Sequence, residues 1–432
     1  MSLNIITFGC KTNQSESNNI ISSLNNYSNF DIIIVNTCAV TAESERKLRQ
    51  FINKTKTNNP DIIIVLIGCF PQAFPDKARE LQSKHDIQIV LGNSQKHKIN
   101  IYLEKYFRDK KNIFEIENIN LIKKFDDINF KNCTNNIIKT RAFVKIQDGC
   151  DRFCSYCIIP YARGRIRSRD PESIIREIKL LSENNYQEIV LTGINLLSYG
   201  KDFSYKNNYN ITKILEQISE INNIKRIRLG SLEPDLITPD LVYNMKSISK
   251  ICPQFHISVQ SGSNNILKKM RRLYTREEYL DKINLIKNNF GNATFTTDLM
   301  VGFPGETDQD FEESLDIISE AGFLKTHVFP YSQRPGTLAA SFDNQITRNI
   351  KSQRVKQAMQ ISNQNTKKIL DKYINTHQDV LFETCDNNNF YRGYTDNYIL
   401  VKAQSSENIS GKIIKTRILS AHDDFLVGEN FI

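Results

Sequence analysis

Short apolar runs alternate with polar, helix-compatible stretches along the first hundred residues. The apolar runs are rich in β-branched residues, as buried strands are; they lie at Asn4–Phe8, Asp31–Val35, Asp61–Ile67 and Gln88–Leu91. The stretches between them predict helices at Asn13–Ser23, Ala42–Lys54 and Gln72–Ser83. This alternation predicts an N-terminal α/β domain over residues 1–111, built on a doubly wound parallel sheet.

A polar stretch rich in Asn and Lys follows at residues 112–136. It holds little periodic apolar pattern apart from Ile113–Ile116 and Ile119–Ile122. A segment of this kind is typical of a connection between domains, and we expect a linker here.

A second alternation of strands and helices fills residues 137–371. Six strands are predicted, at Ala142–Ile146, Glu188–Leu191, Arg226–Leu229, Gln254–Val259, Thr294–Val301 and Lys325–Phe329. The helices predicted between them are Pro171–Ser182, Ile211–Ile218, Pro239–Met245, Arg276–Lys287 and Asp308–Glu320. Six such repeats fall short of the eight of a closed TIM barrel, so a partial (β/α)6 barrel is expected.

The C-terminal segment, residues 372–432, changes to a pattern of strands alone. It follows a long amphipathic helix predicted over Arg348–Tyr373. Strands are expected at Asp379–Glu383, Tyr398–Lys402 and Gly411–Ile418, with turns near Asn387 and Gly393. Together they predict a small β-barrel of about sixty residues.

Composition restricts the class of protein. Hydrophobic residues make up 40% and charged residues 24% of the chain, as in ordinary globular proteins. No apolar run is long enough for a membrane span, and Met1–Cys10 lacks the features of a signal peptide, so a cytoplasmic enzyme is expected. The net charge, 57 − 48 = +9, permits a polyanionic partner. Nine cysteines, an odd number, argue against a disulfide framework and for metal ligation or catalysis.

Three of the cysteines lie on one loop after a predicted strand. Cys150, Cys154 and Cys157 have the spacing C-x-x-x-C-x-x-C. Three thiolates can hold three irons of a cubane cluster and leave the fourth iron open, to chelate the amino and carboxylate groups of S-adenosylmethionine. A structural zinc site is the alternative, but zinc usually takes four protein ligands, and no fourth Cys or His lies nearby.

Three further cysteines each end a predicted parallel strand. Cys10, Cys38 and Cys69 are about thirty residues apart in sequence. Because the carboxyl ends of adjacent parallel strands meet at one edge of the sheet, their thiols should converge there. Two readings stay open on this spacing: a second cluster, or three buried structural cysteines.

The remaining cysteines, Cys133, Cys252 and Cys385, are isolated and expected to be structural. Arg163, Arg165, Arg167 and Arg169 recur with period two, so in an extended segment they would share one face. That face would either grip phosphates or form a solvated, charged edge. A second basic group, Lys268, Lys269, Arg271 and Arg272, is expected to be a solvated helix end.

Around these cysteines the chain resembles the methylthiotransferase branch of the radical S-adenosylmethionine enzymes, over nearly its whole length. Within that family it is most similar to the enzymes that act on threonylcarbamoyladenosine in tRNA. The stretches that carry the resemblance are Thr7-Phe-Gly-Cys-Lys-Thr-Asn-Gln14, Gln147-Asp-Gly-Cys150, Cys157-Ile-Ile-Pro-Tyr-Ala-Arg-Gly164, Leu191-Thr-Gly-Ile-Asn195, His256-Ile-Ser-Val-Gln-Ser-Gly262, Val301-Gly-Phe-Pro-Gly-Glu-Thr307 and His327-Val-Phe-Pro-Tyr-Ser332.

The resemblance implies three domains in the family's order: an N-terminal cluster domain, a radical domain and a C-terminal TRAM domain. It implies two [4Fe–4S] clusters, one on Cys10, Cys38 and Cys69 and the other on Cys150, Cys154 and Cys157. It also implies S-adenosylmethionine as cofactor and a low-potential electron donor as partner. The substrate would be tRNA, at adenosine 37 of the anticodon loop bearing N6-threonylcarbamoyl, and the product its 2-methylthio derivative.

The family also suggests residues that would contact S-adenosylmethionine at the mouth of the barrel. Gly193 and Asn195 end the second barrel strand, where related enzymes hold the amino group, and Tyr156 sits at the usual adenine position. Glu233, Gln260 and Gly302 follow other strands at the same edge. For each of these residues, ordinary packing at a strand end is the alternative.

Three other functions remain as alternatives: methylthiolation of isopentenyladenosine in tRNA, methylthiolation of a ribosomal protein aspartate, and a non-catalytic Fe–S protein. An electron carrier would leave Leu191–Asn195 and Val301–Thr307 without a role. The TRAM-like segment is also unusual for an RNA-binding module, since residues 372–432 carry 6 − 8 = −2 charges. RNA contact there would depend on shape, a few placed cations and stacking by residues such as Tyr391, Tyr394 or Tyr398.

Overall fold

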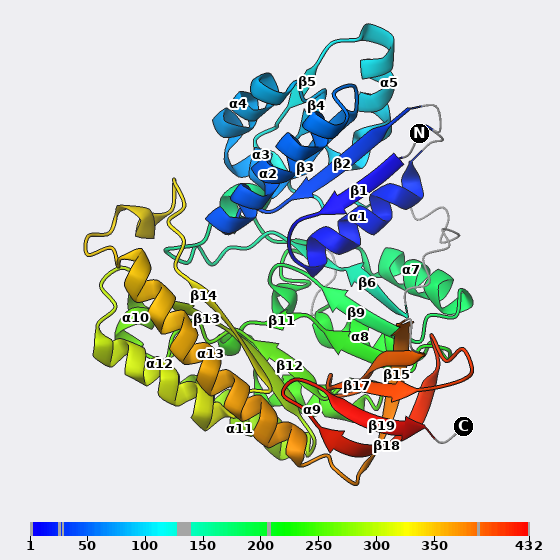
Figure 1. Cartoon of the computed structure of the whole chain (residues 1–432), viewed down its shortest axis with the longest axis vertical. Helices are drawn as coiled ribbons and strands as arrows, with labels where there is room; N and C mark the ends of the chain where they lie inside the picture. The colour runs from blue at the N-terminus through cyan, green and yellow to red at the C-terminus, as the bar shows by residue number, and fades with distance from the viewer. Residues whose placement is uncertain are drawn as a thin grey trace.

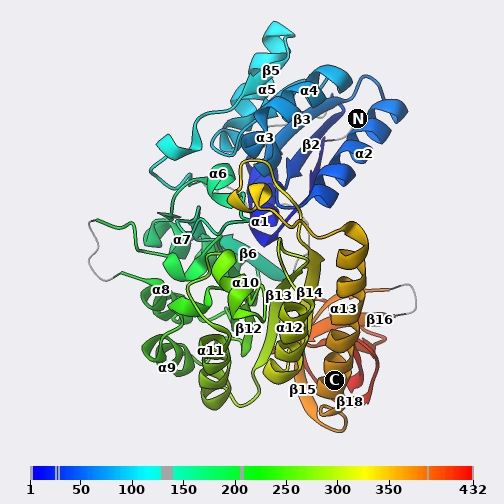
Figure 2. The ribbon, with the colours of Figure 1, turned by 90° about the vertical axis from the view of Figure 1, so that its left-hand side faces the viewer.

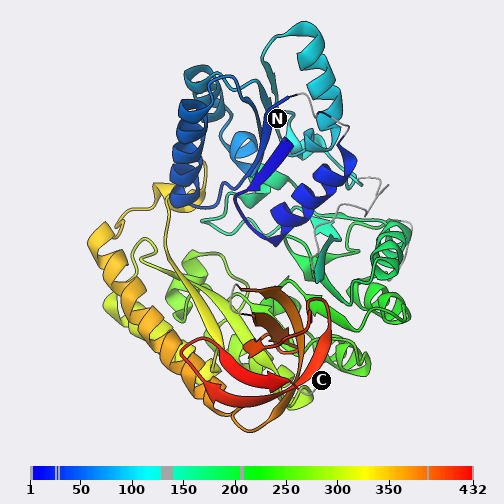
Figure 3. The same ribbon diagram turned by 45° about the vertical axis from the view of Figure 1, so that its right-hand side comes forward.

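Three structural units follow one another along the chain in the computed structural model, which describes residues 3–24, 27, 30–127, 140–204, 209–386 and 389–430. The α/β unit at the N-terminus lies at the upper end of the molecule, and the β-barrel at the C-terminus lies beside the central strand–helix unit in the lower half (Figure 1; Figure 3). Among the described residues no helix combines the length and apolarity needed to cross a bilayer.

The N-terminal unit is a five-stranded parallel sheet. Its strands lie side by side in chain order, β1 (Leu3–Thr7), β2 (Ile32–Thr37), β3 (Ile63–Gly68), β4 (Ile89–Leu91) and β5 (Ile113–Glu115). The helices are α1 (Lys11–Ser23), α2 (Ala42–Asn58), α3 (Cys69–Ala73), α4 (Pro75–His85) and α5 (Ile99–Asp109). Alternate residues of β3 enter separate hydrophobic cores: Ile64 and Leu66 pack with α2, α3 and α4, whereas Val65 and Ile67 pack with α1 and α5. Both faces of the sheet are therefore covered, as predicted.

The prediction missed the last strand and helix of this unit. β5 lies at the start of the segment that we expected to be a linker, and it pairs in parallel with β4. The strand is only three residues long and only Ile113 in it is buried. A pattern this short cannot be distinguished from a loop in sequence.

The central unit is a partial barrel of parallel strands, in agreement with the prediction. Its strands form two sheets, β10–β9–β6 and β11–β12–β13–β14, which a bridge between Ile227 and Ile251 joins. The strands are β6 (Arg141–Lys145), β9 (Glu188–Thr192), β10 (Arg226–Leu229), β11 (Ser231–Leu232), β12 (Gln254–Ile257), β13 (Thr294–Val301) and β14 (Lys325–Pro330). The helices are α7 (Pro171–Glu183), α8 (Ile211–Ser219), α9 (Pro239–Ser247), α10 (Asn264–Lys269), α11 (Arg276–Asn289), α12 (Asp308–Ala321) and α13 (Arg348–Asp371).

Two helices of the barrel show why the sequence starts them where it does. Thr275 and Glu278 form a capping box at the N-terminus of α11, and Thr307 and Asp310 form one at α12. Each pair satisfies two backbone N–H groups that have no partner within the helix. The helix starts therefore follow directly from local sequence.

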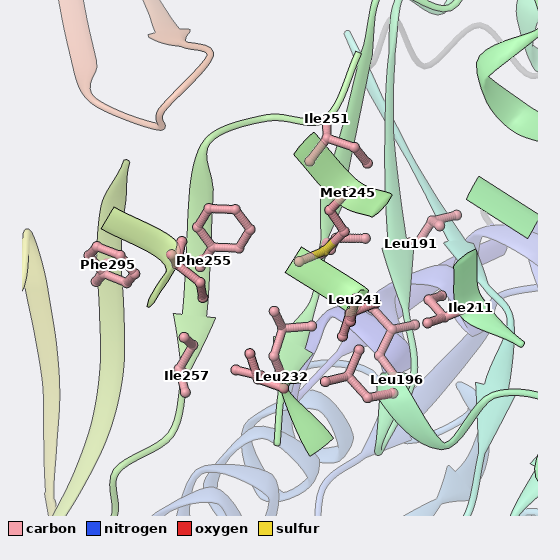
Figure 4. Close-up of a cluster of buried hydrophobic side chains, with 14 of the residues drawn as sticks. Leu191, Leu196, Ile211, Leu232, Leu241, Met245, Ile251, Phe255, Ile257 and Phe295 are labelled. Carbon is pink, nitrogen blue, oxygen red and sulfur yellow. The ribbon is translucent and has the colours of Figure 1, made fainter. Parts of the chain in front are cut away.

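Side chains on the barrel strands alternate between a hydrophobic outer layer and a polar inner face. Phe255 and Ile257 of β12 and Phe295 of β13 point outward into the core that the surrounding helices cover (Figure 4). Because neighbouring residues on a strand point to opposite faces, His256 and Asp298 face the inside of the barrel. The inner face therefore carries charged and polar groups, which is unusual for a core and typical of a site.

The C-terminal unit is a closed five-stranded barrel in the order β15–β16–β17–β19–β18. Its strands are β15 (His377–Cys385), β16 (Phe390–Thr395), β17 (Leu400–Gln404), β18 (Ile413–Ala421) and β19 (Leu426–Asn430). The turn between β16 and β17 packs against the central unit, where Arg228 donates to the carbonyl of Asp396 (2.9 Å) and Thr294 to that of Asn397. This turn covers the amino-terminal end of the partial barrel.

The tyrosines that we expected to stack on RNA bases have other partners. Tyr391 is buried in the core of the C-terminal barrel. Tyr394 and Tyr398 stack on each other with ring centroids 4.6 Å apart, and the guanidinium of Arg141 lies over both rings. Tyr394 and Tyr398 thus help to hold the C-terminal barrel against the central unit, and all three rings already have partners in the protein.

The N-terminal unit docks on the central unit through two helices. Ser15 on α1 donates to the carbonyl of Phe143 on β6 (2.9 Å). The short helix α6 (Ile159–Arg163) of the central unit lies at the junction (Figure 2). Its Ile158 flank and Ala162 belong to the same buried cluster as Cys69 and Phe70 of the N-terminal unit. The two units therefore share part of one core.

Candidate active site

The loop that carries Cys150, Cys154 and Cys157 runs between the short strand β7 (Gln147–Asp148) and α6. β7 pairs with β8 (Arg167–Ser168), which closes the base of the loop. Gly149 has a φ of +70°, and a Cβ there would lie 1.8 Å from the carbonyl oxygen of Arg165. Only glycine can adopt this backbone conformation so close to Arg165, so the start of the loop has a defined position.

Hydrogen bonds from distant elements fix the middle of the same loop. The backbone N–H of Ser155 donates to the carbonyl of Met270 (3.1 Å), and its hydroxyl donates to that of Lys269 (2.8 Å). The N–H of Ala339 donates to the carbonyl of Ser155 (2.7 Å). The three cysteines thus lie on a loop that the central unit holds from two sides.

The three cysteines of this loop are half-buried. Burial raises the pKa of the Cys150 thiol to about 11, and burial followed by the Cys154 thiol also raises the pKa of Cys157. Thiols of this kind become thiolates only when a strong positive charge compensates them, as metal coordination does. The donor set therefore fits iron better than a role as free catalytic thiols.

A cation approaches one of the three sulfurs. The guanidinium of Arg272 lies 3.4 Å from the Cys154 sulfur, donates to the hydroxyl of Tyr274 (3.0 Å) and pairs with Glu233. Burial, opposed by Arg272, raises the pKa of Glu233. We expected Arg272 to be solvated like its neighbours on α10, but only 5% of its side chain is exposed. No motif pointed to it; its position beside Cys154 depends on the tertiary fold.

The residues predicted to contact S-adenosylmethionine lie at the carboxyl ends of parallel barrel strands, at the edge that also carries the cysteine loop. Gly193 and Asn195 follow β9, Glu233 follows β11, Gln260 follows β12 and Gly302 follows β13. Tyr156 lies on the loop itself, between Cys154 and Cys157. This edge is where α/β barrels place their active sites.

Two of these side chains carry a polar atom without a partner. The Oδ1 of Asn195 and the Oε1 of Gln260 are buried and accept no hydrogen bond from the described residues. Only 4% of Asn195 and 9% of Gln260 is exposed. Buried acceptors are almost always satisfied, so orphans at a predicted site indicate a missing donor such as a ligand amino group.

The other predicted contacts already have neighbours in the protein. A Cβ on Gly193 would lie 2.9 Å from Oε1 of Gln147, and one on Gly302 would meet the side chain of Lys351 at 2.3 Å. Burial raises the pKa of Tyr156 well above its ordinary value, so its phenol stays protonated. The glycines thus serve close packing at the mouth, and ligand contact by all six residues stays a prediction.

The three N-terminal cysteines meet at the carboxyl edge of the other sheet. Cys10 precedes α1 as its N-cap, Cys38 follows β2, and Cys69 starts α3 directly after β3. A Cβ on Gly9 would lie 3.3 Å from the Cβ of Cys38. Burial, followed by the thiols of Cys69 and Cys10, raises the pKa of Cys38 to about 12. The fold therefore brings the three thiols together, as the strand-end rule predicts.

Two asparagine amides reach these sulfurs, and the sequence analysis missed both. Oδ1 of Asn13 lies 3.8 Å from the Cys10 sulfur, and its Nδ2 donates to the carbonyl of Thr37, next to Cys38 (3.1 Å). Nδ2 of Asn93 lies 3.6 Å from the Cys69 sulfur. Asn93 comes two residues after β4, so the same strand-end rule could have found it.

In the described part of the chain, no three His, Cys, Asp or Glu side chains are placed to hold a single metal ion. This argues against a compact zinc site at either set of cysteines. A cubane differs, because each thiolate binds a different iron at a separate corner of the cluster. The thiols within each set lie near enough to raise one another's pKa, which is compatible with such a cluster.

A buried network of charges joins the two cysteine sets. Nη1 of Arg163 donates to Glu16 (2.8 Å) and to Asp148 (3.0 Å), while Lys145 and Lys96 each lie 2.6 Å from Glu16. Burial opposes the charge of Arg163, but the Cys69 thiolate and then these carboxylates raise its pKa well above its ordinary value. The network thus sets three cations, Arg163, Lys145 and Lys96, against two carboxylates, Glu16 and Asp148, so that positive charge is in excess.

The alternating arginines are therefore not the exposed row that we expected. Arg163, Arg167 and Arg169 are 1–3% exposed; Arg167 pairs with Asp148, and Arg169 pairs with Glu177. Only Arg165 remains exposed. α6 ends at Arg163 and β8 is two residues long, so the four residues do not lie on one extended strand. The three buried arginines therefore form neither a surface that binds phosphates nor a solvated edge.

The two isolated cysteines that the structure describes, Cys252 and Cys385, belong to no third group of side chains that could hold a metal ion. Cys252 is buried, and burial raises the pKa of its thiol to about 12. Cys385 is exposed at the end of β15. Cys133 lies outside the described residues.

Comparison with known proteins identifies the family. The model of the Radical SAM superfamily matches residues 144–318, and that of the Uncharacterized protein family UPF0004 matches residues 2–92. The threonylcarbamoyladenosine tRNA methylthiotransferase MtaB of Bacillus subtilis (strain 168) is 36% identical over 428 residues, which cover 96% of this chain and 93% of that protein. The chain belongs to the radical SAM methylthiotransferases. It is a transferase, and its family uses S-adenosylmethionine and a [4Fe–4S] cluster.

Other methylthiotransferases are as similar to this one. The tRNA-2-methylthio-N(6)-dimethylallyladenosine synthases of Clostridium tetani and Finegoldia magna are 36% and 32% identical, over 98% of this chain and 95% and 93% of theirs. The fold resembles that of the radical S-adenosylmethionine methyltransferase TsrM from Kitasatospora setae, with a TM-score of 0.54 and 13% identity over 72% of this chain and 66% of that one. Identity alone therefore does not separate the two tRNA substrates.

Proposed function

We propose that this methylthiotransferase adds a methylthio group to carbon 2 of N6-threonylcarbamoyladenosine at position 37 of tRNA. The Bacillus subtilis relative, which carries threonylcarbamoyladenosine in its name, matches nearly the whole chain. The observation that carries the choice of substrate is a set of polar side chains on the inner face of the partial barrel and at the adjoining start of α1, described below.

The six predicted cysteines would hold two [4Fe–4S] clusters. Cys150, Cys154 and Cys157 would ligate the radical cluster, and Cys10, Cys38 and Cys69 a second cluster in the N-terminal unit. When bound, the radical cluster with S-adenosylmethionine supplies the one-electron chemistry that an unactivated aryl C–H bond requires. The protein's own contribution is to position the reactants and to exclude water.

Particular side chains would perform that positioning. The unpaired amide oxygens of Asn195 and Gln260 would accept from the amino group of S-adenosylmethionine. Tyr156, with Gly193, Glu233 and Gly302 around it, would form the remainder of the cofactor's surroundings. The ion pair of Arg272 with Glu233 would hold the Cys154 side of the loop in place.

The inner polar cluster consists of Lys11, His256, Asp298 and His327. Nε2 of His256 lies 3.2 Å from Asp298, whose side chain is 32% exposed, and the rings of His256 and His327 lie 6.0 Å apart. Lys11 and His327 are both exposed to solvent. The protein around them nevertheless lowers the pKa of both side chains through partial burial. Lys11 directly follows Cys10, so the cluster adjoins one of the N-terminal cysteines.

This cluster suits a polar substituent on the base. Threonylcarbamoyl carries a carboxylate, a hydroxyl and a urea-like linkage, which Lys11, His327 and Asp298 can match as donors and acceptor. A dimethylallyl group has no hydrogen-bonding atom, so polar groups around it would lose hydration without compensation. The inner polar cluster therefore favours threonylcarbamoyladenosine.

Dimethylallyladenosine tRNA is the second candidate, because the Clostridium tetani and Finegoldia magna relatives are named for it. The deciding experiment offers the reconstituted enzyme two anticodon stem–loops that differ only in the N6 substituent. Mass spectrometry of the nucleosides should show methylthio product from the threonylcarbamoyl stem–loop alone. Product from the dimethylallyl stem–loop alone would overturn the proposal.

A variant of His327 links the result to the inner polar cluster. His327→Phe removes the hydrogen-bonding ring and keeps its bulk, so it should lower kcat/KM for the threonylcarbamoyl stem–loop. Cleavage of S-adenosylmethionine without substrate should be unchanged. Tyr243→Phe, at an exposed residue of α9, is the control. Nucleosides of cells with and without the protein should differ in the same product.

A further inference from the structure

Arg163 belongs to the central unit, yet its side chain lies against the N-terminal unit. It is the last residue of α6, six positions after Cys157. The side chain is 1% exposed. Its neighbour Ala162 is buried in the same core as Cys69. The central unit thus inserts one guanidinium beside the other unit's cysteines.

Two of the three guanidinium nitrogens are fully engaged. Nη1 donates to Glu16 (2.8 Å) and Asp148 (3.0 Å), and Nη2 donates to Oδ1 of Asn13 (2.6 Å) and to Glu16 (3.1 Å). These four bonds fix the plane of the group. Because a guanidinium is rigid, they also fix the direction in which the third nitrogen, Nε, points its hydrogen.

Nε is buried and has no acceptor among the described residues. A buried N–H without a partner is rare, because it has lost its hydrogen bond to water and formed no other in exchange. The other two nitrogens of this guanidinium are satisfied. Nε of Arg167 in the same network is unpaired as well, but the partners of Arg163 lead toward cysteine sulfurs, and a missing acceptor there would fill the gap. An anionic acceptor is favoured, since the donor is a cation.

The groups nearest to this guanidinium lead to the N-terminal sulfurs. Oδ1 of Asn13, which accepts from Nη2, lies 3.8 Å from the Cys10 sulfur. Nδ2 of Asn93 lies 3.6 Å from the Cys69 sulfur and donates to the carbonyl of Ala162, next to Arg163 (2.6 Å). Cys10 is therefore one side chain away from the guanidinium, and Cys69 is one side chain away from the residue that precedes Arg163.

We propose that Nε of Arg163 donates a hydrogen bond to a sulfur of the N-terminal [4Fe–4S] cluster, so that the radical domain supplies part of the surroundings of the other domain's cluster. This inference rests on the second cluster of the proposed function. Hydrogen bonds to cluster sulfurs help to set the reduction potential. A cationic donor stabilises the more negative, reduced state, and Arg163 thus raises the potential of the N-terminal cluster.

The first test observes this cluster alone. In the Cys154→Ala background the radical cluster has lost a ligand, and the remaining signal comes from the N-terminal cluster. Arg163→Lys keeps the charge but removes the Nε donor, so an EPR-monitored redox titration should show a shift to a more negative potential. Arg167→Lys is the matched control, because Arg167 is buried in the same network and its Nε is also unpaired, but its other nitrogens donate to the carbonyl of Arg163 and to Asp148.

The second test needs no substitution at Arg163 and so does not depend on how the variant folds. Arginine labelled with 15N is incorporated, and HYSCORE spectra of the reduced N-terminal cluster are recorded. A 15N coupling from a hydrogen-bonded nitrogen is expected, and where Arg163→Lys folds it should disappear in that variant but not in Arg167→Lys.

The possible failures are distinct. An assembled N-terminal cluster without a 15N coupling, or with the same potential in both lysine variants, overturns the inference and leaves the proposed function standing. Absence of iron and sulfide from the Cys154→Ala protein, with normal cluster content in Cys38→Ala, overturns the second cluster itself and the inference with it.

Discussion

The guanidinium of Arg272 lies 3.4 Å from the sulfur of Cys154 and forms an ion pair with Glu233. This contact links the middle cysteine of the loop to a strand end on the opposite side of the mouth. Loss of Cys154 therefore removes an iron ligand and leaves a nearly buried cation without its sulfur neighbour.

We expect Cys154→Ala to abolish reductive cleavage of S-adenosylmethionine. A cubane held by two thiolates is not retained as the radical cluster. The measurement is 5′-deoxyadenosine formed by the reduced, reconstituted protein. Full cleavage by the variant would show that the loop does not carry the radical cluster.

We expect Cys38→Ala to separate the two half-reactions. All ligands of the radical cluster lie between Cys150 and Cys157, so 5′-deoxyadenosine should still form, while methylthio product should be lost. Both products are measured in one reaction. Normal methylthio product would mean that Cys10, Cys38 and Cys69 are structural; loss of both activities in a folded protein would indicate a single shared cofactor assembly.

Asn195→Ala and Gln260→Ala should each weaken binding of S-adenosylmethionine. A hydrogen bond to a charged group contributes about 1.5–3 kcal/mol, which corresponds to a loss of about 10- to 100-fold in affinity. Equilibrium dialysis of the cluster-loaded protein measures it. Gln187→Ala, at the amino-terminal end of the same strand β9, is the control and should bind normally. Unchanged affinity in both mouth variants would exclude these amides as contacts.

Gly149→Ala should prevent assembly of the radical cluster. The added Cβ would lie 1.8 Å from a backbone oxygen, at a φ of +70° that alanine rarely adopts. Iron content and 5′-deoxyadenosine should both fall to the level of Cys154→Ala. Gly291→Ala is the control, because a Cβ at Gly291 meets nothing within 4 Å, and its unfolding free energy should change by less than about 0.5 kcal/mol.

The buried network should make the docking of the two units acid-labile. Arg163 and the network lysines, against the cost of burial, hold the carboxyl pKa values of Glu16 and Asp148 well below the ordinary range near 4. A carboxyl with a lowered pKa binds fewer protons when folded than when unfolded. Its stabilising contribution is therefore complete above about pH 5 and is lost as the pH falls through and below 4.

Urea unfolding of wild type and Glu16→Gln measures this effect. At pH 7 the variant should lose about 3–5 kcal/mol, since it leaves buried cations unpaired. The difference between the two proteins should shrink as the pH is lowered. Glu43→Gln, at an exposed pair with Arg46, is the control and should show no such dependence. A difference that stays constant with pH would contradict the role of Glu16.

Sequence patterns predicted the parts of the fold that depend on one strand or one helix. The cysteines converge because each of Cys10, Cys38 and Cys69 ends a parallel strand, a relation that needs no knowledge of packing. Partners chosen by packing escaped prediction. Arg163 has its buried role because Glu16, some 150 residues earlier, lies opposite it. No local sequence pattern indicates such a pair.

The placement of α6 inside the N-terminal core limits how these proteins can be recombined. A hybrid that joins the first unit of one relative to the barrel of another at residue 112 would bring an unfamiliar Ile158 and Ala162 against Phe70. The mismatch would lie in the shared core, next to both sets of cysteines. Exchange between relatives should therefore succeed only where α6 comes from the same relative as the N-terminal unit that it packs against, although α6 and Phe70 are about ninety residues apart in sequence.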